Sequence, residues 1–362
     1  MASNRPTPET TDIATRQLAA SFAPGELAIV CSHYELGVIR SIRPLAGGSA
    51  SSPKVRIDTT TGTFLLKRRE PGRDDPFTVA LSHSIQIHLA SRGFPLARLI
   101  GTRGENNSML QLHGRIYELF DFTNGDRYAG SPEQTVRAGA ALAWFHAAVA
   151  DHASEWTAPR GSFHNPGGID DLIARVGHRM SASAAPTLDR LRALYHEAAA
   201  ALERHGYGRL PAQLIHGDWH PGNLLYAGDR VLTVLDFDSV RLGPRIADVA
   251  GGGLQFSMMA GGRPEDWPAE ADLARLGAFV AGYDSNSPGL PDGERAMVPA
   301  LMIEAVIVEA LAPVASTGRF GDQEAEGVLR TIGRKAAWPR EHASALVETV
   351  RTPGMRAAAT PP

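Results

Sequence analysis

The chain has 362 residues, and 43% of them are hydrophobic, which is enough for more than one packed core. Its net charge of −3 gives no strong positive field, so we expect neither a nucleic acid nor a membrane surface as a partner. A single cysteine, Cys31, excludes a disulfide within the chain, and we expect it to be a small buried residue. We see no signal peptide and no apolar run of the ~20 residues that a membrane span needs, so we expect a cytoplasmic protein.

Periodic patterns predict a small sheet in the first 120 residues and a mainly helical part after it. For the first part, we expect helices at residues 12–22, 26–34 and 77–91, and strands at 40–43, 55–59, 63–68, 108–112 and 115–120. For the second part, we expect helices at 132–149, 169–175, 185–205, 271–283, 294–314, 324–335 and 340–350, and short strands at 213–215, 224–226 and 231–235. Residues 151–168 are predicted to be a loop.

A glycine-containing turn lies two strands before a lysine. The turn contains Gly47, Gly48 and Ser49, and the lysine is Lys67. Glycine lets backbone N–H groups approach a phosphate, and a strand lysine can neutralise phosphate charge. The structural alternatives are an ordinary hairpin loop and a strand-end lysine that reaches solvent. We expect these four residues to contact phosphates.

A second motif holds the residue types that phosphoryl transfer requires. Residues 216–223 read His-Gly-Asp-Trp-His-Pro-Gly-Asn, and Asp236-Phe237-Asp238 follows. Phosphoryl transfer needs a carboxylate that orients and deprotonates a hydroxyl, and oxygen ligands for Mg²⁺. Asp218 precedes Asn223 by five positions and Asp236 follows it by thirteen, which is the order of a kinase catalytic loop. We therefore predict Asp218 as the catalytic base and Asn223 and Asp236 as Mg²⁺ ligands.

The short strands around this motif would bring its polar residues to one end of a small sheet. The alternative is a surface loop with a hydrogen-bonded His and Asp. We place His216 with Asp218 in the catalytic group, because His216 and Gly217 shape the loop. We expect Asp248 to brace the loop rather than take part in the reaction.

These motifs resemble those of the aminoglycoside phosphotransferase and choline kinase-like superfamily, and most closely its homoserine kinase-like bacterial members. The resemblance lies in His216-Gly217-Asp218 with Asn223, in Asp236-Phe237-Asp238, and in the hairpin from Ile42 to Lys67. It extends from about residue 13 to about residue 345. It implies an α+β, two-lobed protein-kinase-like fold, with an N-lobe at 1–120, a C-lobe at 121–350 and a disordered tail at 351–362.

The resemblance also implies an activity and further site residues. It implies an ATP- and Mg²⁺-dependent kinase that phosphorylates a hydroxyl of a small molecule such as an amino alcohol, a sugar or an antibiotic. The nucleotide phosphates would lie at Gly47, Gly48, Ser49 and Lys67, and the backbone of Glu118 and Phe120 would contact the adenine edge. A bacterial protein Ser/Thr kinase of the same fold and a non-catalytic nucleotide-binding protein are the alternatives.

The predicted partner of Lys67 departs from the kinase pattern. A kinase normally pairs this lysine with a glutamate of the next helix. The helix predicted at residues 77–91 contains no Asp or Glu. Gln86, a histidine such as His83 or His88, or an acidic residue just before the helix could replace it, or Lys67 has no fixed partner.

Three further carboxylates are candidates for substrate contact. Glu304 and Glu309 lie inside the very apolar helix predicted at 294–314, and buried carboxylates need partners. The partner is either a nearby arginine or a cationic group of the substrate. Asp238 could contact the loop, the metal or the substrate.

Overall fold

The computed structural model describes residues 22–45, 52–258 and 263–352. The chain divides into two compact units. Unit 1 contains the residues up to Ser91 together with 96–124 and 153–157, and unit 2 contains 92–95, 125–152 and the residues from Ala158 onward. The change of unit after Asn124 lies close to the boundary predicted after residue 120.

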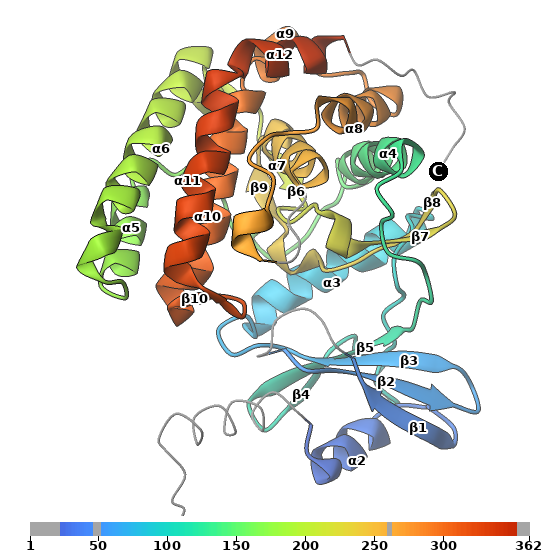
Figure 1. Cartoon of the computed structure of the whole chain (residues 1–362). Helices are drawn as coiled ribbons and strands as arrows, with labels where there is room; N and C mark the ends of the chain where they lie inside the picture. The colour runs from blue at the N-terminus through green and yellow to red at the C-terminus, as the bar shows by residue number, and fades with distance from the viewer. Residues whose placement is uncertain (1–21, 46–51, 259–262, 353–362) are drawn as a thin grey trace, which may run out of the picture. The chain divides into compact units, whose positions relative to one another are not determined.

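Unit 1 is built on a five-stranded antiparallel sheet of order β1-β2-β3-β5-β4 (Figure 1). The strands are β1 (Ile39–Pro44), β2 (Lys54–Thr59), β3 (Thr63–Arg68), β4 (Leu110–Leu112) and β5 (Arg115–Asp121). Its described helices are α2 (Pro24–Ser32) and α3 (Pro76–Ser91). Helix α3 begins where predicted, and the Asp75 carboxylate accepts the Thr78 N–H at 2.8 Å and so caps its first turn.

The two faces of this sheet pack against different helices. Leu119 of β5 belongs to a buried cluster with Cys31 of α2, whereas Ile116 of β5 packs with Val79 of α3. Because side chains alternate along a strand, Glu118 shares the α3 face with Ile116. This face carries the polar cluster of unit 1 described below.

Unit 2 is mainly helical, with short strand pairs that support its loops. Its α-helices are α4 (Pro132–Ala148), α5 (Ile169–Gly177), α6 (Ala185–His205), α7 (Arg245–Ser257), α8 (Leu273–Ser285), α9 (Asp292–Arg295), α10 (Val298–Thr317), α11 (Ala325–Glu341) and α12 (Ala343–Arg351). Its strands are β6 (Gln213–Ile215), β7 (Leu224–Ala227), β8 (Arg230–Val234), β9 (Arg241–Gly243), β10 (Arg319–Phe320) and β11 (Gln323–Glu324). Helices α10 and α11 pack side by side, as Figure 1 shows.

Helices α4 and α8 approach each other through a reciprocal pair of glycines. A Cβ atom on Gly139 of α4 would lie 1.9 Å from the Phe279 carbonyl oxygen. A Cβ atom on Gly282 of α8 would lie equally close, at 1.9 Å, to the Val136 carbonyl oxygen. Only glycine permits this backbone contact. The contact brings together α4, which carries His146, and α8, which carries Tyr283.

Helix α7 was not among the predicted helices. Three consecutive glycines, residues 251–253, lower its intrinsic helix propensity. Packing explains why they are tolerated, because a Cβ atom on Gly252 would lie 2.6 Å from the ring of Phe279 and 3.1 Å from the ring of Trp219. Tertiary contacts therefore determine this helix.

Helix α10 is, in the described part of the chain, the one helix long and apolar enough to cross a membrane by length and composition. The expectation that the chain has no apolar segment of that length is therefore wrong. Burial of 67% of its most apolar window within the protein is typical of a core helix.

Candidate active site

The loop between β6 and β7 holds Asp218 and Asn223 in direct contact. Strand β6 pairs with β9, and a 3₁₀ turn at Pro221–Asn223 leads into β7. The side-chain nitrogen Nδ2 of Asn223 lies 3.0 Å from the main-chain oxygen of Asp218 and 3.0 Å from its Oδ2. Asn223 is buried, whereas the Asp218 side chain is 44% exposed. The loop thus presents an oriented carboxylate at its surface.

The charge of Asp218 is set by its neighbours. Burial on one side would raise the pKa of Asp218, but nearby His220 lowers the pKa more, so that the net shift is downward. The Nε2 atom of His220 lies 3.6 Å from Oδ2 of Asp218. The Nδ1 atom of His220 accepts the Gly222 N–H at 3.0 Å, so a neutral ring carries its proton on the nitrogen that faces Asp218.

Asp236 lies next to Asn223 because the backbone joins their neighbours. The Leu235 N–H donates to the Asn223 carbonyl oxygen at 2.8 Å, and β7 and β8 pair from Leu224 and Val234 onward. Asp236 has a left-handed φ of 60°, which is unusual for a residue with a side chain and recurs at functional sites. Asn223 and Asp236 offer the amide and carboxylate oxygens that Mg²⁺ uses together with phosphate oxygens. Among the described residues, no group of three or more His, Cys, Asp or Glu side chains forms a metal site.

Asp248 of α7 braces the start of the loop, as predicted. Its Oδ2 accepts the His216 N–H at 2.6 Å, and its Oδ1 accepts the Gly217 N–H at 2.8 Å. His146 of α4 contacts Oδ2 at 3.1 Å and, through its other ring nitrogen, the Tyr283 hydroxyl of α8 at 2.9 Å. The helix pair α4–α8 therefore fixes the Asp248 carboxylate, and that carboxylate fixes the loop.

The electrostatics of this brace favour an ionised Asp248. Burial would raise its pKa, but the hydrogen bond from His146 and the Gly217 N–H hold the pKa below its ordinary value.

Gly217 is required here because it has a φ of 76° and a Cβ atom would lie 2.5 Å from the Ser239 carbonyl oxygen.

His216 is a packing residue, and the structure does not support its predicted place in the catalytic group. It is fully buried, with ring contacts to Phe145, Trp219 and Phe237. Neither ring nitrogen has a hydrogen-bond partner within the described chain. Burial lowers the pKa of His216, so its ring is neutral and does not relay a proton.

A small cavity in unit 2 connects Asp218 with Glu309. Its lining includes Asp218, His220, Gln255 of α7 and Glu309 of α10, together with Phe163, Gly217, Trp219, Ala247, Asp248, Gly251 and Gly252. The Nε2 atom of Gln255 donates to Oε2 of Glu309. Burial and the negative charge of Asp218 raise the pKa of Glu309 to about 8. A carboxyl group with a raised pKa thus lines the same cavity as the predicted base.

Glu304 and Asp238 do not line this cavity. Glu304 is buried in α10, and the ring nitrogen Nδ1 of His164 lies 2.9 Å from its Oε1. Its partner is therefore a histidine of the 151–168 loop rather than the predicted arginine or a substrate cation. Asp238 lies half-buried in the 3₁₀ turn that follows Asp236.

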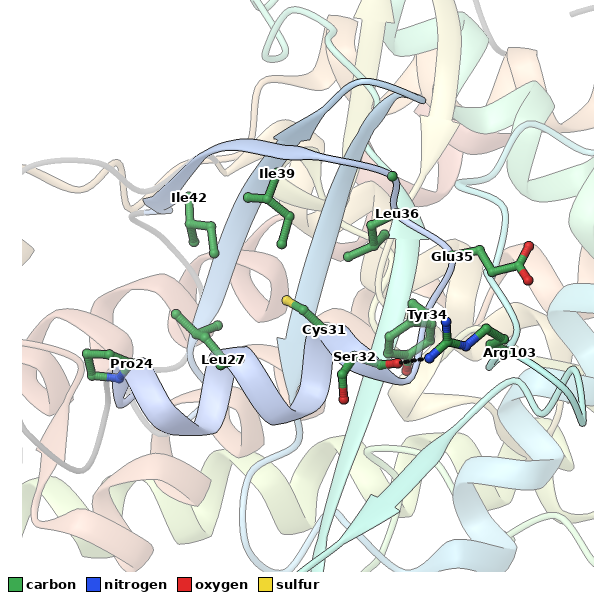
Figure 2. A pocket seen from close by; sticks show the side chains of 12 residues that line it. Pro24, Leu27, Cys31, Ser32, Tyr34, Glu35, Leu36, Ile39, Ile42 and Arg103 are labelled. Atoms are coloured by element: carbon green, nitrogen blue, oxygen red, sulfur yellow. Dashed lines mark hydrogen bonds between the residues drawn. The ribbon is translucent and has the colours of Figure 1, made fainter.

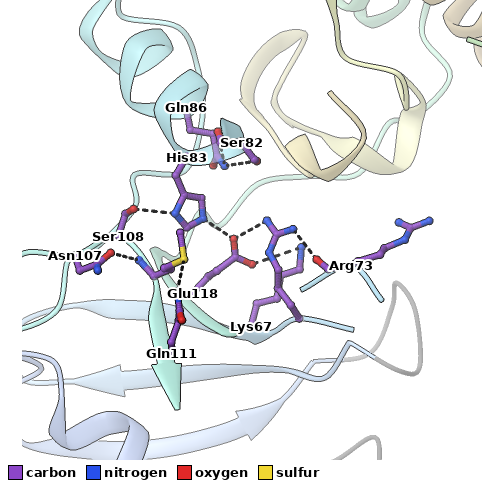
Figure 3. Close-up of polar contacts among 11 residues, drawn as sticks. Lys67, Arg73, Ser82, His83, Gln86, Asn107, Ser108, Gln111 and Glu118 are labelled. Atoms are coloured by element: carbon purple, nitrogen blue, oxygen red, sulfur yellow. Dashed lines mark hydrogen bonds and ion pairs between the residues drawn. The ribbon is translucent and has the colours of Figure 1, made fainter. Parts of the chain in front are cut away.

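In unit 1, Lys67 belongs to a charged cluster centred on Glu118 (Figure 3). The ammonium group of Lys67 lies 3.9 Å from Oε2 of Glu118, and Nη2 of Arg69 lies 2.8 Å from Oε1. Nε2 of His83, on α3, lies 2.6 Å from the same Oε1. The partner of Lys67 thus comes from β5, which was not among the candidates predicted for it. The other phosphate candidates, Gly47, Gly48 and Ser49, lie outside the described residues.

The backbone of Glu118 and Phe120 takes part in the sheet. Strand β5 pairs with β3, so that Glu118 lies opposite Lys67 and Phe120 opposite Leu65. The backbone N–H of Arg69 donates to the Ile116 carbonyl oxygen, and the backbone N–H of Phe122 donates to the Thr63 carbonyl oxygen. These bonds show which cross-strand pairs in this register are the hydrogen-bonded ones. Since such pairs alternate, the N–H and C=O groups of Glu118 and Phe120 point at β3. This geometry does not favour the predicted contact of these groups with adenine.

A larger hollow, of about 800 Å³, lies in unit 1 between α2 and β1 (Figure 2). Apolar side chains dominate it, among them Leu27, Cys31, Leu36, Ile39 and Ile42. None of Lys67, Glu118 and Phe120 lines it. It opens on the sheet face opposite Glu118 and is separate from the charged cluster.

Comparison with known proteins identifies relatives of this chain. A model of the phosphotransferase enzyme family matches residues 41–296. The homoserine kinase of Methylocella silvestris is 31% identical over 217 residues. That match covers 59% of this chain and 63% of the relative, so the chain spans less than two thirds of the length of such curated relatives.

Solved structures share the fold. A microcompartment-associated aminopropanol kinase superposes with a TM-score of 0.66 at 20% identity, over 88% of this chain and 98% of the other. An amicoumacin kinase in complex with AMP-PNP, Ca²⁺ and its antibiotic superposes with a TM-score of 0.66 at 11% identity, over 90% of this chain and 96% of the other. These likenesses confirm the predicted α+β kinase-like fold.

Proposed function

The chain belongs to the phosphotransferase enzyme family, and on that premise we propose that it transfers the γ-phosphoryl group of ATP to a hydroxyl of a small molecule that also carries an amine. The observation that carries the proposal is the contact between Asn223 and Asp218, with 3.0 Å to both the main-chain oxygen and Oδ2. This contact joins a candidate base to a candidate metal ligand, as phosphoryl transfer requires.

Each residue has a defined task in this proposal. Asp218 orients the acceptor hydroxyl and takes its proton, because its carboxylate is ionised and accessible. Asn223 and Asp236 would hold Mg²⁺, which, when bound, offsets the charge of the nucleotide phosphates. Lys67 of unit 1 contributes a positive charge to the phosphates. Gly47, Gly48 and Ser49 remain candidates for phosphate contact.

Glu309 and Gln255 support an acceptor that carries an ammonium group. They line one cavity together with Asp218, but that cavity, at about 10 Å³, has room for no more than one water. An acceptor with its hydroxyl at Asp218 would have to open this cavity to bring its ammonium group to Glu309. The raised pKa of Glu309, about 8, reflects burial and a like charge that a cation would offset. The similar homoserine kinase and aminopropanol kinase are named for acceptors of this kind.

The test is ADP release from Mg²⁺-ATP with a panel of acceptors. The panel contains homoserine, 1-amino-2-propanol, ethanolamine, spectinomycin, a sugar, a nucleoside and a generic protein substrate. For a matched pair of acceptors, we would compare each amino alcohol with the alcohol that lacks its amine. We expect turnover with an amino alcohol, a higher KM without the amine, and a loss of about 10²–10⁴-fold in kcat for Asp218→Asn, the usual range for general-base loss.

Two results would contradict the proposal. Turnover that is unaffected by Asp218→Asn would remove the assigned base. Turnover with the protein substrate but with no small molecule would show a protein kinase instead.

A further inference from the structure

We propose that Glu118 of β5 is the positioning residue for Lys67, in place of the glutamate that a helix supplies in most kinases, and that His83 joins α3 to this ion pair. The inference rests on the proposed role of Lys67 in nucleotide binding. Figure 3 shows Lys67 of β3 and His83 of α3 at the Glu118 carboxylate of β5, and Arg69, just after β3, contacts the same carboxylate.

The sheet itself brings Lys67 and Glu118 together. They are direct cross-strand partners in the β3–β5 pairing, and residues in such positions have neighbouring side chains on one face. The 3.9 Å between the Lys67 ammonium and Oε2 of Glu118 is an ion-pair distance and exceeds that of a direct hydrogen bond. No hydrogen-bond partner of this Oε2 occurs in the described chain. This carboxylate oxygen therefore faces the Lys67 ammonium without a direct hydrogen bond.

The other carboxylate oxygen anchors the rest of the cluster. Oε1 of Glu118 receives Nη2 of Arg69 at 2.8 Å and Nε2 of His83 at 2.6 Å. Glu118 is fully buried, and burial would raise its pKa. The charge of Lys67 and the hydrogen bond from His83 outweigh burial and hold the pKa below its ordinary value. Glu118 therefore stays a carboxylate inside the protein.

His83 contacts the Glu118 carboxylate from α3, the helix after Lys67, where a kinase usually carries its glutamate. Its Nδ1 lies 2.9 Å from the Ser108 hydroxyl, and its Nε2 contacts Glu118. With a proton on Nε2 the ring donates to Glu118, and Nδ1 can accept from the Ser108 hydroxyl. A carboxylate at position 83 would bring like charge next to buried Glu118.

This arrangement has a functional consequence. When a helix supplies the glutamate, movement of that helix breaks the ion pair with the strand lysine. Here both members of the pair belong to one sheet. Strand pairing therefore fixes the position of Lys67. Helix α3 contacts the Lys67–Glu118 ion pair through His83 but contributes neither of its two charges.

The test is equilibrium binding of Mg²⁺-ATP to the full chain, with acceptor KM measured alongside. We expect Glu118→Gln to weaken Mg²⁺-ATP binding about tenfold or more and to change acceptor KM less than twofold, because the lost charge acts on the nucleotide side. In a Lys67→Ala background, Glu118→Gln should add less than about twofold, since its effect passes through Lys67. The double variant His83→Glu with Glu118→Gln returns a carboxylate to the cluster from α3 and should recover at least about threefold of the loss.

Each outcome has one meaning. Wild-type protein that does not bind Mg²⁺-ATP would refute the proposed function itself. Wild-type binding that Glu118→Gln leaves unchanged, or an equal loss with and without Lys67, would overturn the role of Glu118 alone. If Glu118→Gln does not fold, as judged by circular dichroism, Glu118→Asp keeps the charge at a shorter reach and goes through the same cycle with the same criteria.

Discussion

Asn223 directs its side-chain nitrogen at Asp218, at 3.0 Å from both the main-chain oxygen and Oδ2. Both amide hydrogens are thereby used, and the amide oxygen Oδ1 is the atom of this side chain that could bind a metal ion. In the proposed mechanism, one residue would therefore link the orientation of the proposed base Asp218 to the position of the proposed Mg²⁺ ion. A change at Asn223 would therefore affect the orientation of Asp218 and the position of the ion together.

This link predicts a combined defect for Asn223→Ala. We expect kcat to fall by about 10²-fold and the Mg²⁺ concentration for half-maximal activity to rise, because the variant loses a metal ligand and the constraint on Asp218. Asn286→Ala is a matched control, since the Asn286 amide contacts the main-chain oxygen of Ala140 outside the loop. Steady-state rates across a Mg²⁺ titration check this prediction, and an unchanged titration would argue against a metal at Asn223.

The packing role of His216 predicts tolerance of an apolar ring. We expect His216→Phe to keep kcat within about tenfold of the wild type, since the neutral, buried imidazole has only ring contacts to lose and a swap of similar volume costs less than about 1.5 kcal/mol. The pH–rate profile should keep its shape. A loss as large as that of Asp218→Asn would restore His216 to the catalytic group.

The brace by Asp248 predicts coupled losses of stability and rate. Asp248→Asn puts an amide where two main-chain N–H groups need acceptors, so we expect a loss of about 1–3 kcal/mol in the free energy of unfolding and a fall in kcat of about tenfold or more. Glu304→Gln is the matched control, because it neutralises another buried, histidine-paired carboxylate away from the cavity at Asp218. Urea unfolding and kcat measured on both variants should show a rate defect in Asp248→Asn alone. Equal rate defects would mean that kcat follows general stability.

The candidate catalytic loop could be located in the sequence because its residues are close together along the chain. The spacing of Asp218, Asn223 and Asp236 requires only one loop and one strand pair, and the structure places them along those elements. Helix α7 could not be predicted in the same way, because its glycines disfavour a helix and packing against distant segments, including Phe279 and Trp219, stabilises it.

The partner of Lys67 could not be predicted, because it depends on the register of two strands about fifty residues apart. The sequence did contain a signal. Glu118 is an acidic residue inside an apolar strand, and a buried carboxylate needs cations. The kinase pattern predicts the partner in the helix after Lys67, and that helix carries His83 instead of a glutamate. The same pattern predicts that the backbone of Glu118 contacts the adenine edge, but its N–H and C=O groups already take part in the β3–β5 pairing.

The cavity at Glu309 predicts a pH dependence of stability. Its pKa of about 8 in the folded protein is above the ordinary 4.5, so folding favours the protonated form, and the stability it contributes is full below 4.5 and lost as pH rises through 8. Asp218, His220 and Lys335 are the charged groups that act on it, with Gln255 as hydrogen-bond donor. Without acceptor, Glu309→Gln should therefore gain stability relative to the wild type between pH 5 and 8, as measured by urea unfolding. An ordinary pKa at Glu309 would give a constant difference.

The same carboxyl group predicts that an ammonium-bearing acceptor releases a proton when it binds. At pH 7 Glu309 is mostly protonated in the acceptor-free protein, because its pKa is about 8. A cation in the cavity stabilises the carboxylate and lowers that pKa, so the proton leaves and acceptor affinity rises with pH up to about 8. Calorimetric titration of the acceptor in two buffers of different ionisation enthalpy measures this release directly. We expect close to one proton for the wild type and none for Glu309→Gln, whose acceptor KM should rise about tenfold or more with the amino alcohol and change little with the matching alcohol that lacks the amine. Proton release that persists in Glu309→Gln would assign it to another group and remove Glu309 from the acceptor site.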